Sequence, residues 1–260
     1  MPSPSASRST DRESPSVQSV ARRYHRAERA VSWLTALAAA GAFLAAFAAF
    51  SPLPALGVAV ALVVALRVPV FRRRGTVRLR SEAAPEAVVD EFASATPPVL
   101  AFQWAVADEV VRVGDGNEDG GGDGSDPESG SDATYEFSYL LGLRSVSLGL
   151  DVDVTRPSDS PADGTGADGA VPPDAVAVVD IDATADGRPW GAYGVTVRDA
   201  EAGSEAPSDE SGTIVDVELR PTRRFDLRRL PQGLVAGRYY ADVLAAQGYE
   251  VLDRTVSLSR

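Results

Sequence analysis

The stretch that decides the architecture is residues 31–74, which read VSWLTALAAAGAFLAAFAAFSPLPALGVAVALVVALRVPVFRRR. Residues 31–50 carry no charge, and a helix of that length spans roughly 30 Å, the hydrocarbon thickness of a bilayer. The turn at 51–54 contains two prolines, which lack the amide donor that a helix needs. A second apolar run, 55–71, carries only Arg67, which is near enough to the end to reach the headgroups. The pattern predicts a hairpin of two membrane-spanning helices.

Charge is distributed unevenly along the chain. Residues 1–75 hold ten Arg against three acids, whereas residues 76–260 hold fifteen Arg against thirty-four acids, and Lys is absent. Arginines flank the predicted hairpin at 22–29 and 72–74, and its turn carries no charge. The positive-inside rule therefore places both termini in the cytoplasm of a two-span protein of the cell membrane. A cleaved signal peptide and a single span are the alternatives, but two adjacent long apolar runs favour neither.

The remaining sequence divides into an arm and an acidic domain. Residues 1–30 are rich in Ser, Pro and Arg, so we expect a disordered basic arm. Residues 76–260 alternate between strand and helix periodicity, which predicts an acidic cytoplasmic α+β domain with an antiparallel sheet. Inserts rich in Asp, Glu, Gly, Ser and Pro predict disordered acidic loops at about 114–132, 157–173 and 199–212.

Periodicity also predicts the order of elements in this domain. A strand at 76–80 and a helix at 81–93 come first, and a long helix over 226–247 comes near the end. Phe102, Trp104 and Val106 alternate with small or polar residues, which predicts a strand over 99–113. The further predicted strands are 134–154 (bent, or a hairpin about Gly142), 175–183 joined through Asp186-Gly187 to 190–198, 213–220, and a possible last strand at 251–258.

This order resembles the helix-grip fold of the START/polyketide-cyclase-like (SRPBCC) superfamily, as does the opening segment TVRLRSEAAPEAVVDEF at 76–92. The departures are the lack of a second short helix before the second strand and the possible strand after the last helix. The resemblance implies a curved sheet that wraps the long C-terminal helix around an apolar cavity for a lipid-like or other hydrophobic ligand. Aromatic side chains that would then line the cavity, or that pack as ordinary core, are Trp104, Phe137, Tyr139, Trp190 and Tyr193.

The acidic, Lys-free composition resembles that of proteins from salt-loving archaea, whose carboxylate surfaces stay hydrated at high salt. A GC-rich genome, in which Lys codons are scarce, is the alternative. A surface this negative should repel nucleic acid, so we expect no binding to DNA or RNA. The expected partners are the lipid bilayer and a hydrophobic ligand or membrane protein.

Residue types restrict the chemistry of the domain. There is no Cys and the single His is His25, which excludes thiol nucleophiles, Cys/His zinc sites and a Ser-His-Asp triad within the main domain. We expect no cofactor. Asp115, Asn117, Asp119 and Asp126 are spaced as in a calcium loop, but the twelfth position is Asp rather than Glu, so the candidate is weak and we predict no metal site.

Two charged patterns each have two interpretations. Asp151 and Asp153, like Asp180 and Asp182, alternate along predicted strands, which suits either paired catalytic carboxylates or the wet face of a sheet. Arginines are concentrated within residues 220–229 and would meet either anionic headgroups or acids of the same domain. Neither pattern decides function alone.

These observations favour a membrane-tethered, non-enzymatic module that binds a hydrophobic ligand or a membrane partner. The first alternative is a structural or assembly scaffold that recruits protein partners. The second is a lipid-modifying enzyme that uses carboxylates, which predicts a pocket with at least two convergent acids.

Overall fold

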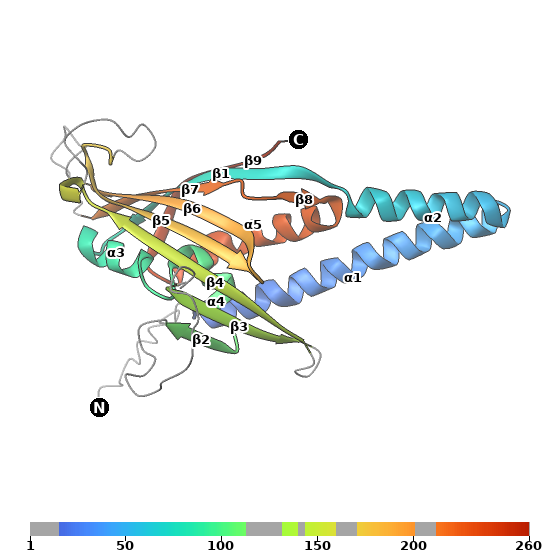
Figure 1. Ribbon diagram of the computed structural model, residues 1–260, viewed down its shortest axis with the longest axis horizontal. Helices are drawn as coiled ribbons and strands as arrows, with labels where there is room; N and C mark the ends of the chain where they lie inside the picture. Colours follow the sequence, from blue (N-terminus) through green and yellow to red (C-terminus); the bar gives the residue numbers. More distant parts are fainter. Residues whose placement is uncertain (1–15, 113–131, 140–143, 160–170, 201–211, 260) are drawn as a thin grey trace, which may run out of the picture.

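The computed structural model describes residues 16–112, 132–139, 144–159, 171–200 and 212–259 (Figure 1). It is an α+β structure: a long apolar helix near the N-terminus, an antiparallel sheet and a C-terminal helix, as the sequence predicts. The helices are α1 (Val17–Ala49), α2 (Pro52–Arg67), α3 (Pro85–Phe92), α4 (Ala101–Trp104) and α5 (Leu230–Ala245). The strands are β1 (Pro69–Ser81), β2 (Glu109–Arg112), β3 (Ala133–Tyr139), β4 (Arg144–Thr155), β5 (Ala175–Ala185), β6 (Arg188–Asp199), β7 (Thr213–Arg220), β8 (Arg224–Asp226) and β9 (Tyr249–Ser259).

The first half of α1 belongs to the folded domain. Val20 and Ala21 are buried in its core, and the Tyr24 ring lies 4.3 Å from the Phe102 ring, centroid to centroid. The expectation of a disordered arm over 1–30 is therefore wrong for residues 17–30, while residues 1–15 lie outside the described part. Helical spacing places the apolar side chains of this segment on one face, which packs against the domain.

The second half of α1 leaves the domain and exposes its apolar side chains. Trp33 is 70% exposed and Phe47 is 55% exposed. Among the described residues, α1 is the one helix long and apolar enough to cross a membrane. Its length and composition agree with the predicted first span.

Helix α2 turns back beside α1 but is shorter than its predicted run of 55–71. It begins at Pro52, since proline suits the first turn of a helix, and it ends at Arg67. Pro69 has no amide donor and restricts Val68 to extended backbone, so the chain enters β1 there. The sixteen residues of α2 extend for about 24 Å, less than the thickness of a typical hydrocarbon core.

The sheet has nine strands, which run in the order β2-β3-β4-β5-β6-β7-β1-β8, with β9 also paired to β1. All pairings are antiparallel. The predicted turn at Asp186-Gly187 joins β5 to β6, and both residues have positive φ, 48° and 71°. Such backbone is what a two-residue hairpin with the twist of its strands requires. Strand β7 has the predicted bounds, and the predicted last strand is β9.

The segment before β2 corrects another expectation. Residues 98–104 form a 3-10 turn followed by α4, not the start of a strand over 99–113. Leu100 and Ala101 are buried, and Phe102 packs on Tyr24 of α1. Contact with a helix almost 80 positions away selects helix here, and strand periodicity begins only in β2. A short helix therefore does precede the second strand.

The core lies between one face of the sheet, here called the inner face, and the helices α3, α4, α5 and the first half of α1 (Figure 1). Its strand residues include Leu79, Leu150, Ile181, Val195 and Val215, all fully buried. The predicted long helix over 226–247 is shorter in the structure, because 224–226 form β8 and 227–229 a 3-10 turn before α5 begins. The opposite, outer face carries no helix in the described structure (Figure 1).

Candidate functional site

The five predicted pocket aromatics do not share one site. Trp104 and Phe137 are half-buried against the core, and the indole Nε1 of Trp104 donates to the Pro97 carbonyl oxygen at 3.0 Å. Tyr139 belongs to β3, but its side chain lies outside the described part. Only Trp190 and Tyr193 come together, at one end of β6.

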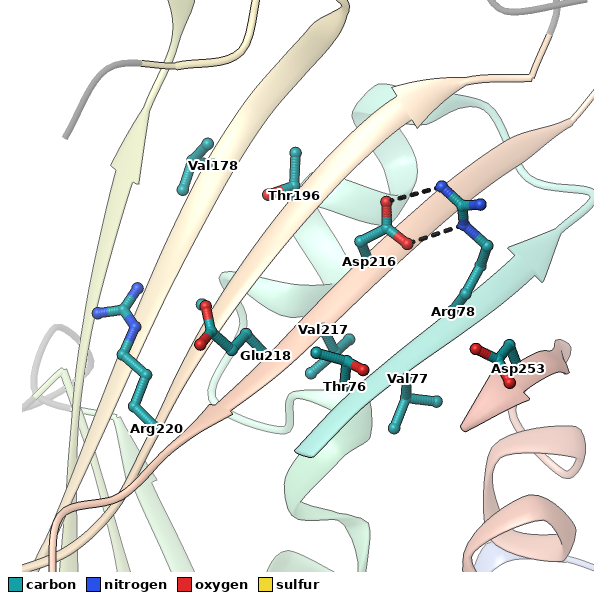
Figure 2. A pocket seen from close by; sticks show the side chains of 11 residues that line it. Thr76, Val77, Arg78, Val178, Thr196, Asp216, Val217, Glu218, Arg220 and Asp253 are labelled. Carbon is teal, nitrogen blue, oxygen red and sulfur yellow. Dashed lines mark hydrogen bonds and ion pairs between the residues drawn. The ribbon is translucent and has the colours of Figure 1, made fainter. Parts of the chain in front are cut away.

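Two grooves of the described structure lie away from the space between the sheet and α5. One groove is on the outer face, has a volume of about 410 Å³ and is open to solvent (Figure 2). The other lies beside Ser94 and Val152 and has a volume of about 420 Å³. Val243 and Leu244 of α5 pack into the core beneath the sheet. The apolar cavity that the family resemblance implies is not among these hollows.

Paired charges line the outer groove. The guanidinium of Arg78 donates to both carboxylate oxygens of Asp216, at 2.9 and 3.2 Å (Figure 2). Arg198 also pairs with Asp216, and with Asp174 at 2.7 Å. Glu218 and Asp253 lie along the same groove (Figure 2). The most enclosed carboxylate here is already held by two arginines, so the groove presents no obvious acid-base pair.

The predicted aspartate pairs also lie on the outer face. In the register of β4 and β5, Asp151 is opposite Asp182 and Asp153 is opposite Asp180. Asp180 pairs with Arg220. Burial, followed by the charges of Asp132 and Asp182, raises the pKa of Asp151 above its usual value. This arrangement is the half-solvated face of a sheet rather than a closed acidic site.

A different set of charges gathers on the inner face, where the sheet meets the α1–α2 pair. Arg73 comes from β1, Arg223 from the connection between β7 and β8, and Arg254 from β9. All three side chains are half-buried. Within the described part of the chain, none of them has a carboxylate partner. We call these three residues the arginine cluster.

Aromatic rings and backbone support the guanidinium groups of the cluster. Arg223 Cζ lies 5.5 Å from the Trp190 ring centroid and 5.2 Å from that of Phe225. Arg254 Cζ lies 4.7 Å from the Tyr240 ring centroid, and Arg254 Nη1 donates to a carbonyl oxygen of α5 at 2.6 Å. Stacking of this kind orients a guanidinium without neutralising it.

The cluster is electrostatically uncompensated. Burial lowers the pKa of Arg223 and of Arg254, and a neighbouring arginine lowers each further: Arg229 in the first case and Arg73 in the second. Arginine nevertheless keeps its charge in proteins. The Nε atoms of Arg223 and Arg254 are buried and have no hydrogen-bond acceptor in the described structure.

Two tyrosines complete the site. Burial raises the pKa of Tyr193, against the opposing charges of Arg73 and Arg223, and burial also raises the pKa of Tyr240. Both hydroxyls therefore remain protonated at neutral pH and can donate hydrogen bonds. Tyr193 interacts electrostatically with Arg73 and Arg223, and Tyr240 with Arg73 and Arg254, so Arg73 is the arginine common to both tyrosines.

Contacts of α5 fix the depth of this cluster relative to the apolar half of α1. The Gln232 side chain donates from Nε2 to the Ser32 hydroxyl at 3.0 Å, and Ser32 is the second residue of the apolar run 31–50. At the next position, a Cβ on Gly233 would lie 3.8 Å from Arg73 Nη1. The guanidinium of Arg73 therefore lies beside α5 at the level where the apolar surface begins.

Sequence reasoning found the cluster only in part. Arg223 lies within the arginine-rich segment 220–229, whereas the sequence places Arg73 in the basic flank of the predicted hairpin and gives no signal for Arg254. The available signal was that Arg73 alternates with Arg72 and Arg74, so a strand there places it on the opposite face. The predicted calcium loop lies within 113–131, outside the described residues, and the described part contains no group of three metal-ligating side chains.

Comparison of the chain with protein-family models, with curated proteins and with solved structures finds no match.

Proposed function

We propose that this protein is a membrane-anchored, non-enzymatic binding module whose acidic α+β domain lies on the cytoplasmic surface. In this proposal α1 and α2 cross the bilayer as a pair, with both termini in the cytoplasm. The basic flanks at 22–29 and 72–74 support that orientation. The shorter α2 requires local thinning of the bilayer or tilt of its partner.

The observation that carries the proposal is the change in surroundings along α1. One continuous helix begins in the domain core at Val20 and ends with an apolar surface that includes Trp33, Leu37 and Phe47, all more than half exposed. Apolar surface of this extent is stable in lipid rather than in water. Because the helix is shared, the domain is held against the bilayer rather than on a flexible linker.

Two further observations support a binding role. The strand order β2 to β7 followed by β1, with α5 on the inner face, supports a helix-grip-like domain, to which β9 is an addition. The arginine cluster is a concentrated, uncompensated charge beside the membrane. Residues 76–260 hold thirty-four acids that could pair with arginines, so half-buried arginines without a carboxylate partner support a bound anionic ligand.

Single cysteines test the topology cleanly, because the chain has none of its own. Ser51→Cys, in the α1–α2 turn, should react with a membrane-impermeant maleimide on intact cells. Ser257→Cys, in β9, should react only after the cells are opened. Resistance of the protein to extraction with alkaline carbonate should accompany both results. Labelling of Ser257→Cys on intact cells, or release of the chain by carbonate, would exclude the proposal.

An assembly scaffold is the second candidate, favoured by one feature of the sheet. Strand β9 pairs only with β1 in the described structure and exposes Leu252, Val256 and Leu258. An exposed strand edge can pair with a strand of another protein. Cross-linking from Ser257→Cys in native membranes separates the candidates, because a scaffold must give one stable protein adduct.

A further inference from the structure

We infer that Arg73, Arg223 and Arg254 bind a phosphate group, held between the inner face of the sheet and α5 at the depth of the bilayer surface. This inference deepens the proposed function by naming the chemistry of the ligand. The phosphate has two possible sources, a lipid headgroup or a soluble phosphate, which the test below distinguishes.

The donors suit an oxoanion with several oxygens. A guanidinium presents a planar fork that matches phosphate oxygens, and three such forks come from separate strands and connections. Tyr193 and Tyr240 add neutral hydroxyl donors beside them. The unsatisfied Nε groups of Arg223 and Arg254 are further donors without acceptors.

The chain itself does not compensate these charges. Arginines on the outer face, such as Arg78, Arg198 and Arg220, each pair with an aspartate. Arg223 and Arg254 of the cluster stack on aromatic rings instead, in a domain where carboxylates outnumber arginines. Like charges repel here, since Arg73 acts on Arg254 and Arg229 acts on Arg223, and a bound anion would reduce that repulsion.

Position favours an anion that arrives from the membrane. Arg73 contacts α5 at Gly233, one residue from the Gln232 side chain that bonds Ser32. The apolar half of α1 begins at that level, so the cluster lies where the phosphates of a leaflet are found. Trp33, 70% exposed on the next position of α1, suits the same interface.

The test uses the full chain in maltoside micelles, which contain no phosphate, at constant ionic strength. Dioctanoyl phosphatidylglycerol, dioctanoylglycerol and inorganic phosphate are each titrated while the thermal midpoint is recorded, and native mass spectrometry counts bound lipid. We expect the phospholipid to raise the midpoint and the phosphate-free diacylglycerol to leave it unchanged. If inorganic phosphate alone raises it, the source is a soluble phosphate. A midpoint that responds to none of the three overturns the inference.

The neighbours of Arg73 in β1 provide the matched control. Arg73→Gln, Arg223→Gln and Arg254→Gln should each weaken phosphate binding by about tenfold or more, whereas Arg72→Gln and Arg74→Gln, exposed in β1, should change it less than about twofold. Equal losses in both groups would show a diffuse charge effect and refute the site. Arg223→Lys should bind better than Arg223→Gln, which separates a role in binding from one in folding. All variants should stay in the membrane fraction, so failure here leaves the topology proposal intact.

Discussion

The two faces of the sheet treat arginine in opposite ways. On the outer face, Arg78 and Arg198 share Asp216, and Arg220 pairs with Asp180. On the inner face, Arg223 stacks on Trp190 and Phe225 without an acid partner in the described structure. The same residue type thus contributes to a solvated charge network on one side and to a concentrated positive potential on the other. In the function proposed above, the outer face stabilises the domain and the inner face binds the anion.

Replacement of one arginine on each face by methionine should change stability in opposite directions. Without phosphate, Arg223→Met should raise the free energy of unfolding by up to about 1 kcal/mol, since methionine keeps the contact with the rings and removes repulsion. Arg198→Met should lower it by about 0.5–1 kcal/mol, because Asp174 and Asp216 lose a partner. Reversible denaturation in maltoside micelles measures both.

A clear fall in stability of the Arg223 variant would mean that the fold itself stabilises this charge. The comparison between faces would then fail, and the cluster would be part of the core. Adding the phosphatidylglycerol probe gives an internal check. The probe should stabilise the natural chain but not Arg223→Met, so the natural chain should then have the higher free energy of unfolding.

Much of this comparison could be predicted from the sequence. Strand alternation identified β5, β6 and β7 and the Asp-Gly turn, because one face of each strand is apolar and the other polar. The acids at 151, 153, 180 and 182 follow the same rule, and of their two interpretations the structure favours the wet face of a sheet. The class of fold followed from these elements and from the final helix.

The errors share a physical cause, which is contact between distant segments. Helix α4 forms where alternation predicted a strand, because Phe102 packs on Tyr24 of α1. Residues 17–30 looked too polar to fold, yet their apolar side chains cover the core of a domain that begins some fifty positions later. The arginine cluster combines residues from β1 and β9, which are far apart in the sequence, and no local pattern could place Arg254 near Arg73.

His25 joins α1 to α4, and it should make that junction sensitive to pH. Its ring nitrogens face two acceptors, Glu28 Oε2 at 3.1 Å and the Phe102 carbonyl oxygen at 3.0 Å. Only the protonated ring can donate to both. Burial opposes protonation and so does Arg29, but these hydrogen bonds and the charge of Glu28 prevail and raise the pKa of His25.

A raised pKa means that the contribution of His25 is complete below its unfolded value and is lost as the pH rises through the folded value. The thermal midpoint should therefore fall by about 1–2 °C between pH 6 and pH 8. His25→Gln should remove that dependence, whereas a substitution of the exposed Arg26 should retain it. An unchanged pH profile in His25→Gln would show that the ring does not titrate at the junction.

The smallest effect should come from the outer face, at Asp151. Burial and the charges of Asp132 and Asp182 raise its pKa above the usual 3.8, so ionised Asp151 opposes folding at pH values above its folded pKa. Asp151→Asn should stabilise the protein by a few tenths of a kcal/mol at pH 7 and low salt. Asp153→Asn is the control, since its cross-strand neighbour Asp180 already pairs with Arg220.

The salt dependence of these stability differences should distinguish the two faces. At molar salt, charges are screened beyond about 3 Å, so the gain from Asp151→Asn should disappear on the exposed face. The half-buried arginine cluster is screened less, and the difference between Arg223→Met and the natural chain should persist. If both differences vanish together in molar salt, the inner arginines are as well solvated as the outer acids, and the cluster has no special affinity for an anion.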